Sequence, residues 1–276
     1  MPWPTGSVGT AAGLPGGAAT EVDPTGQPWL DLLEIALEEP AHAWSSAAIA
    51  AAARPAGAPL LHGAHLELDA VRANGLVRRL AKGVGISLAD QLDARAAIRA
   101  AIERDESTLA EMAERCGASI DAFALLAQVA AMPVLHAAVR ATQSAGLDVW
   151  LHGYCPVCGA WPALAEIRGI ERERRLRCGA CTADWALPLL HCAYCAETDH
   201  EKLGSLHAEG EEHLRRVETC ESCHGYLKTV TTFDALVGRA LPLVDISTIA
   251  LDLVAQDRGY GRPSRPGWAP ILATGT

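Results

Sequence analysis

The sequence lacks an excess of positive charge and is poor in aromatic residues. Its 276 residues include 23 Lys and Arg against 33 Asp and Glu, a formal net charge of −10, and only 5% are Phe, Trp or Tyr. Neither half is basic, since residues 1–150 hold 10 basic and 17 acidic residues, and residues 151–276 hold 13 and 16. Proteins that bind nucleic acid through phosphate contacts, or membranes through a polybasic surface, need clustered Lys and Arg. The composition argues against both classes.

Signals for secretion and for a membrane span are also missing. The first 24 residues contain no Lys or Arg and nine Gly or Pro, so we expect a disordered tail rather than a signal peptide. Residues 122–139 are uncharged but include Gln128, Pro133 and His136. We interpret them as a buried core helix, kinked or ended near Pro133, and not as a membrane span. The expected location is the cytoplasm.

Motifs of hydrolytic metalloenzymes are absent from the sequence. There is no His-Glu-x-x-His, which would place two metal ligands and a general base on one helix. His62 and His65 lie near Glu67 and are interpreted as loop histidines. Cys116 stands alone and is interpreted as a small buried hydrophobic residue. The sequence therefore does not predict an enzyme.

Eight of the nine cysteines, by contrast, fall into four pairs of the form Cys-x-x-Cys. The pairs are Cys155 and Cys158, Cys178 and Cys181, Cys192 and Cys195, and Cys220 and Cys223. Two residues between cysteines let one tight turn aim both sulfurs at one point, and a tetrahedral metal needs two such turns. Structural disulfides are rare in cytosolic chains, and thioredoxin-type pairs need a βαβ context that is not evident here. Metal ligation is the favoured interpretation.

Pairing in chain order predicts two metal sites of four cysteines each. The separation between Cys158 and Cys178 is 19 residues, within the usual window of metal ribbons, and that between Cys195 and Cys220 is 24. The first site then contains Cys155, Cys158, Cys178 and Cys181, and the second contains Cys192, Cys195, Cys220 and Cys223. Four thiolates in a tetrahedron suit zinc or iron, and spacing does not choose between them. Gly159 suggests that the first turn alone has ideal knuckle geometry.

Polar residues near the cysteines are interpreted as accessory. His191 and His224 adjoin cysteines and are expected to support the ligands or lie at the surface. The charged run from Glu171 to Arg177 is expected to be the solvated face of a hairpin strand, with a docking patch as the alternative. Trp161 and Trp185 are expected to fill a small core beside the metals.

The predicted fold class is α+β, with helices first and metal modules after them. A helix is expected between Pro28 and Pro40, and helix starts are expected at the Ser87 to Asp90 and Thr108 to Glu111 capping boxes and at Ser119. Helices are also expected over 233–241 and 244–255. The predicted organisation is a tail, an all-α domain, two metal modules, C-terminal helices and a loose tail, over residues 1–24, 25–150, 151–190, 191–229, 230–262 and 263–276.

The cysteine region resembles the formate dehydrogenase accessory protein FdhE family. The matching features are Cys155-Pro-Val-Cys-Gly159, Leu176-Arg-Cys178 with Trp185 downstream, Cys192-x-Tyr-Cys195, Arg216-Val-Glu-Thr-Cys220 followed by Tyr226-Leu-Lys228, and Leu251 to Tyr260. The resemblance implies two rubredoxin-like modules in which the eight cysteines bind iron or zinc. It also implies a cytoplasmic, non-enzymatic factor that contacts the catalytic subunit of formate dehydrogenase during assembly.

Alternatives remain open at this level. Either the metals only hold the fold of a docking chaperone, or they take part in redox chemistry, which requires iron. A zinc-ribbon protein that binds nucleic acid or acts in transcription is the competing function. The alanine-rich helices are compatible with a dimer contact or with core packing alone.

Overall fold

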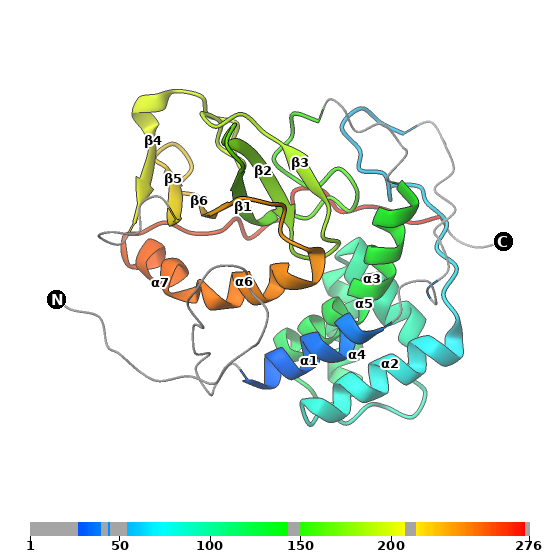
Figure 1. Ribbon diagram of the computed structural model, residues 1–276. Coiled ribbons are helices and arrows are strands. Elements are labelled where there is room, and N and C mark those ends of the chain that lie inside the picture. Colours follow the sequence, from blue (N-terminus) through cyan, green and yellow to red (C-terminus); the bar gives the residue numbers. More distant parts are fainter. Residues whose placement is uncertain (1–26, 40–43, 45–53, 143–149, 208–213, 274–276) are drawn as a thin grey trace.

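A computed structural model describes residues 27–39, 44, 54–142, 150–207 and 214–273. A helical part and a sheet part lie side by side, and two further helices run along the sheet (Figure 1). The helical part comprises α1 Gln27–Glu38, α2 Ala70–Gly83, α3 Ala94–Glu103, α4 Glu106–Arg115 and α5 Ile120–Thr142. This order agrees with the predicted α+β class. The predicted tail at residues 1–24 lies outside the described residues.

The starts of α3 and α4 differ from the predicted capping boxes. Asp93 caps α3 and Asp105 caps α4, each accepting hydrogen bonds from backbone N–H groups of the first turn. Ser87 lies before a turn, and Thr108 lies inside α4, where its N–H donates to Asp105. Aspartate caps a helix as well as serine does, so the two boxes were wrong by a few residues. The Ser119 cap on α5 is confirmed by its bond from the Ala122 N–H at 3.3 Å.

Helix α5 is the central helix of the hydrophobic core. It continues through Pro133 to Thr142. Of the two predicted possibilities, a kink or an end near this proline, the end is therefore wrong, although Pro133 removes one backbone hydrogen bond. By length and composition, Ile120–Ala141 could cross a membrane, but 67% of the tested window is buried inside the protein. Packing against α1 to α4 compensates for the missing bond and accounts for the apolar sequence.

One six-stranded sheet has the four cysteine turns at a single end of its strands. Its strands are β1 Pro162–Arg168, β2 Glu173–Cys178, β3 Asp184–Ala186, β4 Leu203–Leu206, β5 Arg215–Cys220 and β6 Tyr226–Thr232. Their order is β3-β2-β1-β6-β5-β4, and only the central β1–β6 pair is parallel. The three strands on each side form one antiparallel metal module. Pairing of β1 with β6 joins the two modules into a single sheet.

The C-terminal segment departs from the predicted helices. Residues 233–237 are irregular and are followed by the short 3₁₀ helix η4, Gly238–Ala240. The N–H of Leu236 donates to Glu166 at 2.9 Å, and its carbonyl accepts from Arg177 at 2.8 Å. These buried partners replace helical hydrogen bonds. The second predicted helix is two helices, α6 Leu241–Ser247 and α7 Ile249–Asp257, with Thr248 between them.

The segment predicted as a loose tail is packed against the rest of the protein. From Pro263 to Ala273 it runs back across the molecule to the helical part (Figure 1). Leu272 is buried, and the Trp268 N–H donates to the Gly159 carbonyl at 2.9 Å. Arg99 of α3 donates to the carbonyls of Leu272 and Ala273. The segment therefore acts as a strap that connects the first cysteine turn to α3.

The charged run before Cys178 is a solvated face only in part: Glu171, Arg172 and Glu173 are exposed, whereas Arg174 and Arg177 are buried. Arg174 and Arg177 are only 5% and 3% exposed. Arg174 pairs with Glu218 at 2.7 Å, and Arg177 pairs with the fully buried Glu166. The prediction was wrong for these two arginines, because each pairs with a carboxylate on another strand, which only the tertiary structure reveals.

Candidate metal centres

The first cluster has the geometry of a tetrahedral thiolate site. Cys155 and Cys158 precede β1, Cys178 ends β2, and Cys181 follows in the turn to β3. The Sγ atoms of Cys155 and Cys181 lie 3.4 Å apart, and those of Cys158 and Cys178 lie 3.5 Å apart. All four sulfurs lie within 4.8 Å of one another, and all four side chains are buried. The structure therefore brings together the four cysteines of the predicted first site.

The second cluster repeats this arrangement in the other module, at the same end of the parallel strands β1 and β6 as the first. The Sγ atoms of Cys192 and Cys223, and those of Cys195 and Cys220, lie 3.7 Å apart. All four again lie within 4.8 Å of one another, but Cys195 and Cys223 are exposed. The structure groups the cysteines as the spacing predicts, two consecutive pairs to each cluster.

Each of the four cysteine turns has the same backbone conformation. The residue after the second cysteine has a positive φ at all four turns: 76° at Gly159, 64° at Thr182, 62° at Ala196 and 51° at His224. Its N–H donates to the carbonyl of the first cysteine in the first three turns, at 2.9–3.1 Å. Sequence reasoning found the ideal turn only at Gly159, because the other three residues rarely adopt this conformation.

The donor set fits a bound divalent or trivalent metal ion. A tetrahedral site with metal–sulfur bonds of about 2.3 Å requires S···S separations of about 3.8 Å, close to those observed. Backbone N–H groups of Val157, Cys181 and Tyr194 donate to cysteine sulfurs at 3.4 Å, as expected around thiolates. Burial raises the pKa of the Cys155 and Cys181 thiols well above the usual range. A cation among the sulfurs would reverse that shift by stabilising the thiolates.

The helical part holds the first cluster from several directions. Arg104, directly after α3, donates to the Cys158 carbonyl at 2.9 Å and to the Trp268 carbonyl at 2.8 Å. The N–H groups of Leu60 and Leu61 donate to the Pro156 and Val157 carbonyls. All four cysteines belong to the same hydrophobic core as α1, α2 and α5. The first cluster is thus built into the interface between the two parts.

Aromatic side chains fill the space beside the cysteine turns. Trp185 is 3% exposed and donates to the His152 carbonyl, so its predicted core role is confirmed. Trp161 is only half-buried, and its ring contacts the rings of Tyr154 and Tyr194 with centroid distances of 6.1 and 5.2 Å. Since Tyr154 precedes Cys155 and Tyr194 lies between Cys192 and Cys195, these three rings connect the turns of the two clusters.

A buried charge network joins the second module to α6 and α7. Lys228 of β6 is 1% exposed, and its Nζ lies 2.6 Å from carboxylate oxygens of both Asp245 and Asp252. Arg262 pairs with the same two carboxylates, and the Tyr226 hydroxyl donates to Asp252 at 2.8 Å. The Tyr226-Leu-Lys228 segment therefore anchors the sheet to the helices. The sequence did not reveal its acidic partners, which lie 17 and 24 residues farther along the chain.

The remaining candidate residues lie outside the clusters. His191 and His224 belong to neither group of sulfurs. His62 accepts hydrogen bonds from Trp268 and from the Ile271 N–H through Nδ1, so it holds the C-terminal strap. Cys116 is half-buried and free, and its sulfur accepts from the Ala89 N–H at 3.5 Å.

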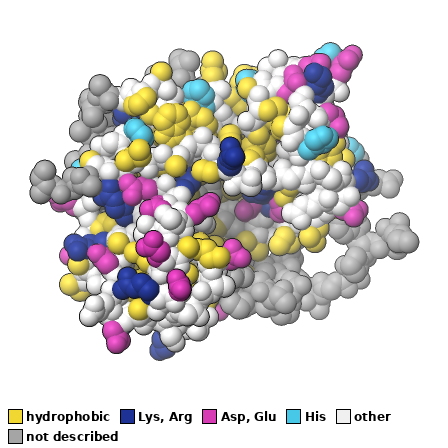
Figure 2. All heavy atoms as spheres, turned by 180° about the vertical axis from the view of Figure 1, so that it is seen from behind, with side chains coloured by type: hydrophobic (Ala, Val, Ile, Leu, Met, Phe, Trp, Pro, Cys, Tyr) yellow, Lys and Arg dark blue, Asp and Glu magenta, His cyan; other side chains and the backbone are white. Residues whose placement is uncertain are grey.

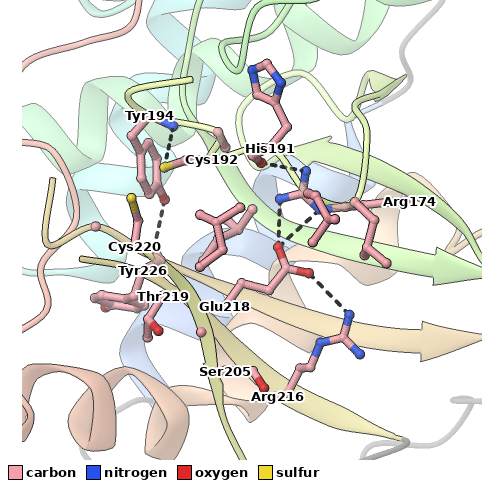
Figure 3. Close-up of a pocket in the computed structure, with 17 residues that line it drawn as sticks. Arg174, His191, Cys192, Tyr194, Ser205, Arg216, Glu218, Thr219, Cys220 and Tyr226 are labelled. Carbon is pink, nitrogen blue, oxygen red and sulfur yellow. Dashed lines mark hydrogen bonds and ion pairs between the residues drawn. The ribbon is translucent and has the colours of Figure 1, made fainter. Parts of the chain in front are cut away.

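Two cavities adjoin the clusters. The larger, 870 Å³, lies between α5, the first cluster and α6, and includes Ile120, Leu125 and Ile246 in its walls. The smaller, 430 Å³, lies against β4 and β5, beside the second cluster. Figure 3 shows its wall, with Cys192 and Cys220 on one side and Glu218 between Arg174 and Arg216 on the other. Both volumes are in the range of ligand or peptide sites.

The C-terminal part of the sequence is similar to known proteins. Residues 190–267 match the FdhE C-terminal domain family. An FdhE homolog from Aquifex aeolicus is 32% identical over 120 residues, 42% of this chain and 41% of the relative. One from Stutzerimonas stutzeri is 38% identical over 111 residues, 39% of this chain and 35% of the relative. These matches thus span about two fifths of the length of the curated relatives.

The similarity of fold extends farther than the similarity of sequence. The crystal structure of the FdhE protein from Pseudomonas aeruginosa aligns with 87% of this chain and 85% of its own, with a TM-score of 0.52 and 23% identity. The two proteins therefore share their fold over both the helical part and the sheet part. In the sequence of its C-terminal domain and in its overall fold, this chain is therefore similar to FdhE proteins.

Proposed function

We propose that this protein is a cytoplasmic accessory factor in the maturation of formate dehydrogenase, and that it binds the catalytic subunit of that enzyme. The observation that supports the proposal most is that the match to the FdhE C-terminal domain covers the second cysteine cluster and the ion pairs of Lys228 that anchor it. The eight cysteines are proposed as ligands of two iron or zinc ions. A closed site of four sulfurs has no open coordination position for substrate, which supports a non-enzymatic role.

The arginines of the sheet support a protein partner over a nucleic acid. Arg174 and Arg177, from the most basic segment, are buried in ion pairs. On the face shown in Figure 2, Lys and Arg side chains lie among Asp and Glu side chains and form no continuous basic surface. Phosphate-driven binding needs such a surface. A mobility shift with duplex DNA or RNA at low salt would contradict the proposal.

The groove between α5 and the first cluster is the proposed docking surface for the catalytic subunit. Its wall includes Ile120, which is 42% exposed, together with apolar side chains of α5. Exposed apolar surface in a concave groove is typical of protein-binding sites. The distant Val71 on α2 is 82% exposed and lies outside the groove wall, so it provides a matched control.

Affinity purification of the full chain with a co-expressed formate dehydrogenase catalytic subunit tests this proposal. We expect the unmodified chain and Val71→Glu to recover the subunit, and Ile120→Glu to recover at least about tenfold less, since a charge would be buried on binding. Failure of the unmodified chain to recover the subunit would contradict the partner. Equal recovery with both variants would contradict only the docking surface.

The metal is proposed to be structural if zinc and redox-active if iron. Zinc has no redox chemistry, whereas a rubredoxin-like iron centre cycles between ferrous and ferric states. Metal analysis with an optical spectrum, on protein purified without oxygen and without added metal, distinguishes the two. Iron with ferric–thiolate absorption after oxidation supports a redox role. Colourless zinc protein that restores formate dehydrogenase activity to a deletion strain would contradict it.

A further inference from the structure

The two cysteine clusters have the same ligands but very different surroundings. Every cysteine of the first cluster is at most 1% exposed, and all four lie in the main hydrophobic core. In the second cluster, Cys195 and Cys223 are exposed, and none of its cysteines belongs to a hydrophobic core cluster of the described residues. Solvent and dissolved ligands therefore reach two residues of the second cluster, Cys195 and Cys223, but no cysteine of the first.

The contacts that hold the two turns of each cluster together also differ: those of the first cluster involve the core, and those of the second do not. Separating the turns of the first cluster requires breaking hydrogen bonds from Arg104, which follows α3, and from Leu60 and Leu61, which lie between α1 and α2. The two turns of the second are connected within their own module, by the Ser222 hydroxyl, which donates to Glu197 at 2.6 Å, and by the Tyr194 hydroxyl, which donates to the Tyr226 carbonyl at 3.0 Å. Opening the first cluster thus involves the core, whereas opening the second is a local event, and local openings require less free energy than global ones.

A second route to the exposed cluster passes through the 430 Å³ cavity. Cys192 and Cys220, its two buried cysteines, contribute to the cavity wall, as Figure 3 shows beside Tyr194. Leu189 and Leu190 at the cavity are more than half exposed. An incoming ligand can therefore approach from the solvent side, where Cys195 and Cys223 lie, or from the cavity side.

We propose that the second cluster is an exchangeable metal site, which passes its ion to an incoming thiolate or chelating ligand, while the first cluster retains its ion as long as the protein is folded. In the exchange, donor atoms of the incoming ligand replace the four cysteine–metal bonds one by one. The released thiolates take up protons from water, and no electron is transferred. The proposal rests on metal binding by both clusters, which the metal content of the purified protein tests separately.

Zinc release from the full chain tests the proposal. Protein loaded with zinc in both clusters is mixed with an excess of a zinc-binding dye at neutral pH, and absorbance records the zinc transferred. We expect two phases of equal size, with the slow one at least about tenfold slower, and an unchanged circular dichroism spectrum after the first. Release of both ions in one phase, or none before unfolding, would overturn the proposal.

Variants assign the phases to the clusters. Cys223→Ser is expected to bind about half as much zinc and to lack the fast phase, because it removes one exposed ligand. Cys116→Ser is the matched control, since this thiol lies outside both clusters, and should retain both phases. A fast phase that persists in folded Cys223→Ser would contradict the assignment.

Chemical labelling gives the same answer without any substitution. The unmodified zinc protein is treated with N-ethylmaleimide together with the dye, and mass spectrometry locates the alkylated cysteines after the fast phase. Labels are expected on Cys192, Cys195, Cys220 and Cys223, while the cysteines of the first cluster stay protected. Labelling of the first cluster at the same rate or earlier would overturn the exchange proposal. Protein that binds no zinc or iron at all would instead contradict the metal assignment itself.

Discussion

Exchanging glycine and alanine at two equivalent turn positions tests the packing of the first cluster. Gly159 and Ala196 each follow the second cysteine of a turn, with φ of 76° and 62°. The perturbations are Gly159→Ala and Ala196→Gly. Because the backbone conformation is nearly the same, the difference between the two effects reports what surrounds each turn.

The structure gives the expected magnitudes. A Cβ on Gly159 would lie 2.4 Å from the Trp268 carbonyl oxygen and 3.1 Å from Pro59 Cγ. The left-handed conformation costs about 1–2 kcal/mol with a side chain, and overpacking adds about 1–3 kcal/mol, so Gly159→Ala should destabilise by about 3 kcal/mol. Ala196 is exposed, and relief of its conformational strain exceeds the entropy cost of glycine by about 0.5 kcal/mol.

Thermal unfolding of the metal-loaded protein measures both effects. For a chain of this size, 1 kcal/mol corresponds to a shift in Tm of about 2–3 °C. We expect Gly159→Ala to lower Tm by about 6–9 °C and Ala196→Gly to raise it by about 1 °C. An unchanged Tm in Gly159→Ala would refute the close contact between the C-terminal strap and the first turn. Tm shifts of equal size and opposite sign would show that backbone conformation alone accounts for the effects of both substitutions.

Three further predictions concern buried charges. Burial and the nearby Arg140 lower the pKa of His136 to about 4 from 6.5. Because the unfolded chain takes up a proton at this residue between pH 7 and pH 5 and the folded chain does not, the free energy of unfolding falls by about 2 kcal/mol over this range. The Tm of His136→Leu should therefore fall less than that of the unmodified chain. Asp252→Ala leaves Lys228 with one counter-charge fewer and should destabilise by about 3 kcal/mol in thermal unfolding, whereas the exposed Asp257→Ala on the same helix should not. Arg104→Ala removes the hydrogen bonds to the Trp268 and Cys158 carbonyls, together with a longer one to the Ile102 carbonyl, and should cost about 2 kcal/mol by the same assay. An unchanged Tm in either destabilising variant, or a His136→Leu protein with the same pH dependence as the unmodified chain, would contradict the corresponding contact.

Some local sequence signals were strong enough to predict the structure. Cys-x-x-Cys fixes a turn within four residues, so the chain-order grouping of the cysteines followed from spacing alone. The helical character of the first half followed from alanine content and capping residues, although Asp93 and Asp105 replaced the predicted caps. Helix boundaries were less well determined because aspartate and serine cap equally well. The predicted helix over 233–241 failed because Glu166, far away in sequence, binds the Leu236 N–H.

By itself, the sequence predicted the grouping of the eight cysteines, the α+β order and the similarity to FdhE proteins, because each depends on residues within short segments. Tertiary structure decided the rest. It joined the two modules through the parallel β1–β6 pair, buried Arg174 and Arg177 against carboxylates, and placed Lys228 between two aspartates. It also enclosed the first cluster and left the second at the surface. These features depend on which distant segments pack together. The Cys-x-x-Cys motif is the same in both clusters and therefore does not predict which residues will surround it.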